Sequence, residues 1–168
     1  VAVDLVVEVN AANAALRLSP MEAPRILGYT LLAAQAAFQG SNEEDRDIAA
    51  IVAGSRTAVQ LLDQRDEANG LASLPNRYGV IGHGDAVRYG TEVARRTVAL
   101  AASKGYSESR RQWEPTKNPT PFTWVPTGRG EPGLDPGWAD IAPVVAASSS
   151  CTLPDPTEEQ LLEQARIP

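Results

Sequence analysis

The sequence contains one cysteine and one histidine among 168 residues, and this scarcity removes several classes of site. Cys151 has no second cysteine with which to form an internal disulfide or a CxxC metal pair. We interpret it as a small apolar side chain rather than a reactive thiol. His83 would need carboxylate or thiolate partners to hold a metal ion, and no spacing in the chain points to them. Without a G-x-S-x-G signature beside it, His83 is predicted to form hydrogen bonds, at a helix surface or between helices.

Long basic runs and long apolar runs are also absent. The net charge is −6, and the basic clusters are no longer than the pairs Arg95-Arg96 and Arg110-Arg111, which argues against a nucleic-acid surface. The longest uncharged run, residues 26–42, contains Thr, Gln, Gly, Ser and Asn. A run this short and polar does not span a bilayer. We therefore predict no nucleic-acid partner and no membrane span.

Aromatic residues make up only 5% of the chain, and alanine supplies much of its 43% hydrophobic content. This balance favours closely packed helices over a sheet of aromatic and β-branched residues. We predict a mainly α fold, with an Ala-rich bundle of about four long helices over residues 1–111. An extended Pro/Trp-rich arm over 112–156 and a short C-terminal helix over 157–168 are predicted to follow.

Caps and breakers predict the ends of the helices. Asp4 is expected to cap a first helix that runs to about Leu18. Two capping boxes, at residues 19–22 and 41–44, are expected to open the second and third helices. In the second helix, Pro24 can delay the regular hydrogen bonding, and Gly40 is expected to end it. A polar connection over residues 63–74 leads to a fourth helix over about 78–103, with a break near Gly84.

Apolar residues at helical spacing predict the buried face of each helix. These faces are Leu5, Val6, Val9 and Leu16; Leu27, Leu31, Ala34 and Phe38; Ile48, Ile51, Val52, Ser55, Val59 and Leu62; and Val80, Val87, Thr91, Ala94, Val98 and Ala101. Gly84 and Gly90 would each cost about 1 kcal/mol relative to alanine inside the fourth helix. Close approach to a neighbouring helix, or a break at Gly84, explains their presence.

Residues 112–156 differ in composition from the helical part. Seven of the thirteen prolines lie between Pro115 and Pro143, and the segment holds all three tryptophans: Trp113, Trp124 and Trp138. A Pro-rich stretch alone is typical of a disordered linker, but exposed indoles promote association. We therefore predict an ordered arm that lays these rings and Phe122 across the helical body or a neighbouring chain.

Three further patterns have ordinary explanations. Gly82-His83-Gly84 lacks the third glycine of a dinucleotide loop, because Val87 stands at that position. The acidic run at residues 43–45 suits a solvated first turn of a helix rather than a paired-carboxylate site. Arg110-Arg111 can hold a phosphate or carboxylate, although a solvated surface pair is the commoner outcome.

The order of several short motifs resembles the bacterial vanadium-dependent haloperoxidase-like proteins of the type 2 phosphatidic acid phosphatase superfamily. The resemblance covers most of the chain, from the first helix to Pro156, and implies that this chain corresponds to the N-terminal helical half. The matching pieces are the Asn10–Asn13 region, residues 23–38, Gly84-x-x-Val87-x-x-Gly90-x-x-Val93-Ala94, Trp124-Val125-Pro126-Thr127 and Gly137-Trp138.

The resemblance implies a vanadate or phosphate site built from three motifs: Lys-x6-Arg-Pro, Pro-Ser-Gly-His and Ser-Arg-x5-His. Cationic side chains there neutralise the anion, while one histidine bonds the central atom and another serves in acid–base work. Lys104 is followed seven residues later by Arg111, but Gln112 replaces the required proline.

The two histidine motifs are also incomplete in this chain. His83 follows Gly82 but no serine precedes that glycine, and the two Ser-Arg pairs lead to Leu62 and Thr116 instead of histidine. No catalytic, cofactor-binding or metal-binding residue of the family is therefore carried onto this chain. Vanadate or phosphate would belong to a partner chain.

Two functional classes follow from these patterns. In the first, the chain is the non-catalytic half of a haloperoxidase- or phosphatase-like enzyme and shapes the site and the oligomer surface of a C-terminal partner. In the second, it is a non-enzymatic helical accessory or scaffold subunit held by its Trp-rich arm; an unrelated helical protein is the third alternative. Both leading classes predict an obligate complex and an isolated chain without haloperoxidase or phosphatase activity. The compartment stays open, with an extracytoplasmic or secreted location slightly favoured.

Overall fold

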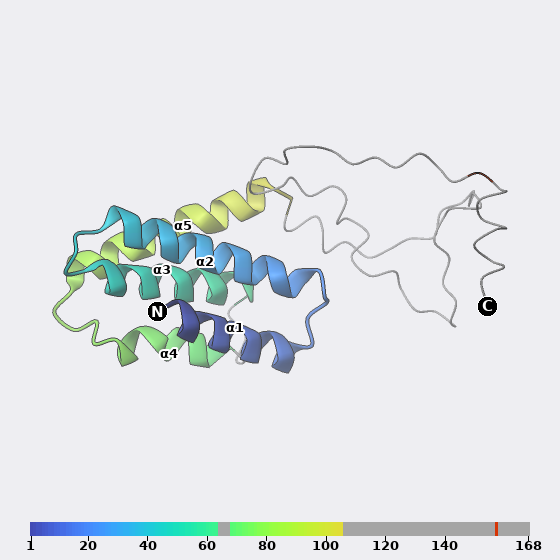
Figure 1. Ribbon diagram of the computed structural model, residues 1–168, viewed down its shortest axis with the longest axis horizontal. Coiled ribbons are helices and arrows are strands. Elements are labelled where there is room, and N and C mark those ends of the chain that lie inside the picture. Colours follow the sequence, from blue (N-terminus) through green and yellow to red (C-terminus); the bar gives the residue numbers. More distant parts are fainter. Residues whose placement is uncertain (64–67, 106–156, 158–168) are drawn as a thin grey trace.

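The computed structural model describes residues 1–63, 68–105 and Thr157. Within these residues the chain forms five helices and no strand, which confirms the predicted mainly α fold (Figure 1). The helices are α1 (Ala2–Leu16), α2 (Glu22–Gly40), α3 (Arg46–Leu61), α4 (Asn69–Arg77) and α5 (Gly84–Ser103). The predicted arm over 112–156, its three tryptophans and residues 158–168 of the predicted C-terminal helix lie outside the described residues.

Helix α3 is the centre of the bundle. It contacts all four other helices, and Figure 1 shows it between α2 on one side and α4 on the other. Eleven of its 16 residues are buried, and most of these are small. Ala49, Ala53 and Gly54 keep its surface shallow, so that neighbouring backbones approach closely. The low aromatic content of the sequence therefore matches a core filled by short side chains in close contact.

Helix α1 starts earlier than the sequence predicted. Val1 occupies the N-cap position, so the prediction that Asp4 caps this helix is wrong. Asp4 lies in the first turn, where its carboxylate suits the positive end of the helix dipole and accepts a hydrogen bond from the Tyr78 hydroxyl. The helix ends at Leu16 instead of about Leu18, because Arg17 adopts a left-handed conformation with φ of 51°. Of the predicted apolar face, Leu5 and Val9 are fully buried.

The first predicted capping contact forms ahead of helix α2, although Met21 and not Ser19 occupies the N-cap position. The Ser19 hydroxyl accepts a hydrogen bond from the Glu22 backbone N–H at 3.0 Å, as the capping box requires. The helix begins at Glu22, two residues before Pro24, since a proline in the first turn removes no intrahelical hydrogen bond. It ends at Gly40, as predicted.

Of the predicted buried face of α2, only Ala34 is confirmed. Phe38 is exposed, and Leu27 and Leu31 are only partly buried. The buried hydrophobic residues are Ile26, Tyr29, Ala33, Ala34 and Ala37. The small alanines allow α2 to approach α3 closely; an added Cβ on Gly54 would lie 3.3 Å from that of Ala34. The helix therefore turns its alanines inward and leaves its larger side chains at the edge of the contact.

Helix α3 begins at Arg46 and has Asp45 at its N-cap position, so the second predicted capping box, unlike the contact of the first, is wrong. The side-chain Oδ1 of Asn42 accepts a hydrogen bond from the Asp45 backbone N–H at 2.9 Å, so the predicted cap at Ser41 lies one residue too early. Glu43 and Glu44 consequently belong to the turn before the helix and not to its first turn. The predicted apolar face is confirmed, with Val59 partly buried and its other members buried.

Helix α4 lies where the sequence predicted a polar connection ended by Pro75. The structure contradicts that prediction, because residues 69–77 are helical with Leu71 and Leu74 buried. Pro75 lies inside the helix, in its last turn. Two contacts fasten this end to α1: Arg77 pairs with Glu8, and Tyr78 donates to Asp4. The Asp4 carboxylate raises the pKa of Tyr78 to about 12.

The predicted start of the fourth helix at about residue 78 is wrong, and the helix begins where a break near Gly84 was one of two explanations for the glycines. The predicted helix over 78–103 begins only at Gly84, because Gly79 and Gly82 before it adopt φ values of 67° and 93°. Ala94 and Ala101 of its predicted face are buried, whereas Val80 lies outside the helix. Gly90 fits the predicted close approach, since an added Cβ would lie 2.6 Å from the carbonyl oxygen of Ala49. No helix of the described segments is long and apolar enough to cross a membrane.

Candidate functional site

His83 connects the starts of two helices. Its Nδ1 lies 2.8 Å from Oδ1 of Asp45, which joins the N-terminal end of α5 to that of α3. This is the interhelical hydrogen bond that the sequence analysis gave as one of two roles for His83. The hydrogen bond to His83, followed by that to Asn42, lowers the pKa of Asp45. Both side chains are engaged in the bundle, and the contact is structural.

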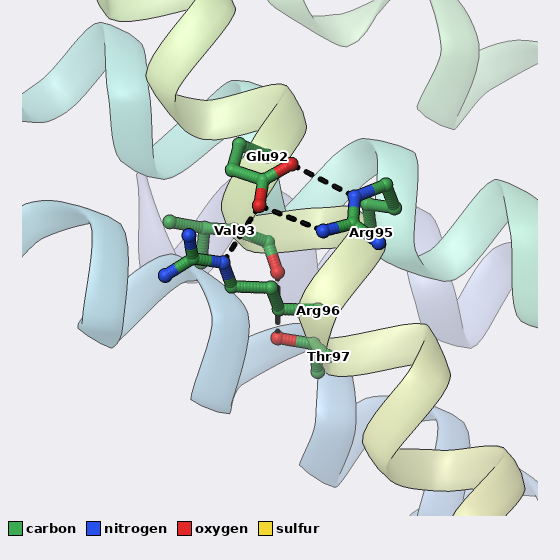
Figure 2. Close-up of polar contacts among 5 residues, drawn as sticks. All are labelled: Glu92, Val93, Arg95, Arg96 and Thr97. Carbon is green, nitrogen blue, oxygen red and sulfur yellow. Dashed lines mark hydrogen bonds and ion pairs between the residues drawn. The ribbon is translucent and has the colours of Figure 1, made fainter.

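The basic pair Arg95-Arg96 is neutralised in part by Glu92. Figure 2 shows both guanidinium groups reaching the same carboxylate, with N–O distances of 2.8 Å for Arg95 and 2.7 Å for Arg96. The same view shows Thr97, whose hydroxyl donates to the Val93 carbonyl at 3.0 Å. The hydrogen bonds from Arg95 and Arg96 lower the pKa of Glu92 to about 2. Because this trio is solvent-exposed on one helix, we assign it to the surface of α5.

The Glu92 trio gives a pH prediction. The folded pKa of Glu92 lies below its ordinary 4.5, so the stability it contributes is complete above pH 4.5 and is lost as the pH falls toward 2. Carboxyl NMR titration at low salt should give a midpoint far below 4.5, and the double substitution Arg95→Gln with Arg96→Gln should move it up toward 4.5. Salt should raise the wild-type midpoint by screening. A wild-type midpoint at 4.5 at low salt would show that the trio does not persist in solution.

The residues that the structure describes contain no group of three or more His, Cys, Asp or Glu side chains placed to hold a metal ion. Cys151, Arg110 and Arg111 lie outside the described residues. No catalytic constellation is assembled around His83, whose described side-chain partner is Asp45.

An apolar groove is the candidate interaction site of the bundle. It has a volume of about 520 Å³ and lies where the start of α1 meets α2 and α3. Apolar side chains from all three helices line it, together with a few polar residues at its edge. The lining residues are Val1, Ala2, Leu31, Ala34, Gln35, Phe38, Gln39, Asp47 and Ala50.

The groove explains the misassigned face of α2. Three of its four predicted core residues, Leu31, Ala34 and Phe38, form the α2 wall of the groove. The sequence pattern correctly identifies an apolar stripe on α2, but these side chains line a groove that the described helices do not fill. Arg46 extends over the Phe38 ring, with its guanidinium carbon 4.9 Å from the ring centre. A cation over an aromatic face holds that ring at the groove edge.

Helix α1 also presents apolar side chains to solvent. Val3 and Val7 are 74% and 59% exposed, and they are one helical turn apart on α1. Single exposed apolar residues are ordinary on protein surfaces, but two on one helix face near an apolar groove favour an interface. This surface can bind apolar side chains of another chain; it carries no group suited to covalent chemistry.

Comparison of this chain with models of known protein families, with curated protein sequences and with solved structures finds no match.

Proposed function

We propose that this chain is the non-catalytic N-terminal half of a vanadium-dependent haloperoxidase-like or acid-phosphatase-like assembly. In this proposal it completes a helical bundle and shapes the site and the oligomer surface of a C-terminal partner chain. The partner would carry the three anion-binding motifs that are incomplete here, and with them the vanadate or phosphate. The order of motifs along the sequence supports the assignment to this family, and the apolar groove supports association with another chain through this face.

The groove is the observation that carries the proposal. Leu31, Ala34 and Phe38 form an apolar wall that continues the packing surface of α2 beside α1. Side chains of this kind gain free energy, about 25 cal/mol per Å² of apolar surface, when a partner removes them from water. An amphipathic helix of the partner chain is the proposed occupant, because such helices bind by laying an apolar face into a hydrophobic groove. Leu31, Ala34 and Phe38 share one face of α2 and would contact that helix.

A charge placed in the groove tests this association. Phe38→Asp should weaken binding of the partner about tenfold or more, because it removes the apolar ring from the contact and places a carboxylate against apolar side chains of the partner. Ala36→Asp is the matched control: it adds the same charge to an exposed position of the same helix, outside the groove lining. Native mass spectrometry of the purified particle would measure the bound fraction, and circular dichroism would check that both variants stay helical.

Three outcomes separate the alternatives. A co-purifying chain with the three motifs, released by Phe38→Asp but not by Ala36→Asp, supports the proposal. A partner that lacks those motifs supports the second class, a helical accessory or scaffold subunit. A monodisperse 17.8 kDa wild-type monomer that binds no hydrophobic dye would contradict both classes.

A further inference from the structure

A second hollow lies on the opposite side of α3 from the groove residue Ala50, between α3, α4 and the start of α5. It has a volume of about 340 Å³, within the range of small-molecule pockets. One face of α3, an outer edge of α4 and two valines near the start of α5 line this cleft. The lining residues are Val52, Ser55, Arg56, Val59, Gln60, Ala72, Pro75, Asn76, Val80 and Val87.

The charged group of the cleft is a cation. Among the described residues that line it, Arg56 is the only charged one, although the chain as a whole carries a net charge of −6. Within the described segments, Arg56 makes no hydrogen bond or ion pair, whereas Arg77, Arg88, Arg95 and Arg96 each contact a carboxylate. A guanidinium without a carboxylate partner is available for an anion that enters the cleft.

The other polar groups of the cleft favour one orientation of a ligand. The Ser55 hydroxyl is buried and already donates to the Ile51 carbonyl at 2.7 Å. The carbonyls of Pro75 and Asn76 accept the backbone N–H groups of Tyr78 and Gly79. Free donors therefore lie on the side chains of Arg56, Gln60 and Asn76, and all three residues are exposed at the rim.

The walls of the cleft are apolar. Val52 is buried at its floor, and the partly buried Val59, Val80 and Val87 line its sides. A hydrocarbon tail placed against these valines leaves water, while a carboxylate at the rim accepts paired N–H groups of the guanidinium. A cationic ligand suits neither the valine walls nor the Arg56 guanidinium. A purely apolar ligand would leave Arg56 without an anionic partner.

We propose that the cleft binds an amphipathic monoanion, a carboxylate with a short hydrocarbon tail, whose head group lies against Arg56 and whose tail lies among the four valines. This site is separate from the apolar groove and independent of the proposed assembly. Its ligand would bind to the bundle itself, whichever chain is the partner.

Calorimetric titration of the full chain with octanoate tests the proposal. Octanoate should bind saturably, Arg56→Gln should weaken it about tenfold or more through loss of a charge-assisted hydrogen bond, and Arg17→Gln should leave it unchanged. Arg17 provides the control because it is also an arginine without a carboxylate partner in the described residues, and it does not line the cleft. Acetate, which has the head group without the tail, should bind much more weakly.

A variant that fills the cleft and a ligand without the carboxylate provide two further tests of octanoate binding. Ala72→Phe, at an exposed position of the lining, should fill the cleft and block octanoate while the guanidinium remains. Octan-1-ol should bind the wild type more weakly than octanoate does. To Arg56→Gln, the two ligands should bind equally. Octanoate that fails to saturate at millimolar concentration, or that binds Arg56→Gln as tightly as the wild type, would overturn the proposal. Tighter binding of octyl phosphate than of octanoate would overturn the choice of a carboxylate.

Discussion

Replacement of Leu71 with alanine is expected to lower the free energy of unfolding by about 2–5 kcal/mol. Leu71 is only 1% exposed and belongs to the cluster that joins α1, α2, α3, α4 and α5, with Val9, Leu62 and Ala101 among its members. Alanine would leave a cavity there, because the surrounding helices are already in close contact and relax only in part. Urea unfolding followed by circular dichroism at 222 nm would measure the change.

Ser73→Ala is the matched control for this prediction. Ser73 is an exposed residue of the same helix, and its hydroxyl donates only to the Gly70 carbonyl at 3.0 Å. Its replacement should change the stability by less than about 0.5 kcal/mol. Equal stabilities for the two variants would mean that α4 does not belong to the core in solution.

Helix α4 shows the limit of prediction from local pattern. It has nine residues, two buried leucines and an internal proline, so its periodicity is too short to distinguish a helix from a polar connection. Most of its stability comes from tertiary contacts with residues far away in the sequence, such as the pairing of Arg77 with Glu8. The four longer helices repeat their apolar spacing over several turns, and their existence was predictable for that reason.

The faces and ends of the longer helices were predictable only in part. Leu27, Leu31 and Phe38 are larger than the alanines of α2, so an apolar pattern assigns them to the core. The helix instead buries Ala33 and Ala37, because a shallow surface lets it approach α3. At the start of α3, Ser41 and Asn42 are both good caps, and only the three-dimensional turn selects Asn42.

The two candidate sites differ in how much the sequence revealed. The wall of the apolar groove was visible as a stripe on α2, although we assigned it to the core. No sequence pattern predicted the cleft, because Arg56, Asn76 and Val87 come from three different helices and no local motif joins them. Helix α3 contributes Ala50 to the groove and Val52 to the cleft, so variants at Phe38 and Arg56 test the two sites separately.

Replacement of Gly90 with alanine is expected to destabilise the bundle, although alanine is the better helix former. A Cβ at this position would lie 2.6 Å from the Ala49 carbonyl oxygen and 3.0 Å from the Val52 Cβ, both on α3. Overpacking of this kind costs about 1–3 kcal/mol, and contact with a backbone oxygen places it in the upper part of that range. The gain of about 1 kcal/mol in helix propensity offsets part of the cost. The expected net loss is about 1–2 kcal/mol by urea unfolding.

Gly28→Ala measures the contribution of helix propensity alone to the free energy of unfolding, because Gly28 lies inside α2 with nothing within 4 Å of an added Cβ. This variant should be more stable than the wild type by about 0.5–1 kcal/mol. The two substitutions are chemically identical, so opposite signs would show that the α3–α5 contact, and not helix propensity, requires glycine at position 90. A Gly90→Ala variant as stable as Gly28→Ala would mean that α5 lies farther from α3 in solution. The cleft between α3, α4 and α5 would then also be wider, and the proposed contact of a hydrocarbon tail with both Val52 and Val87 would lose its basis.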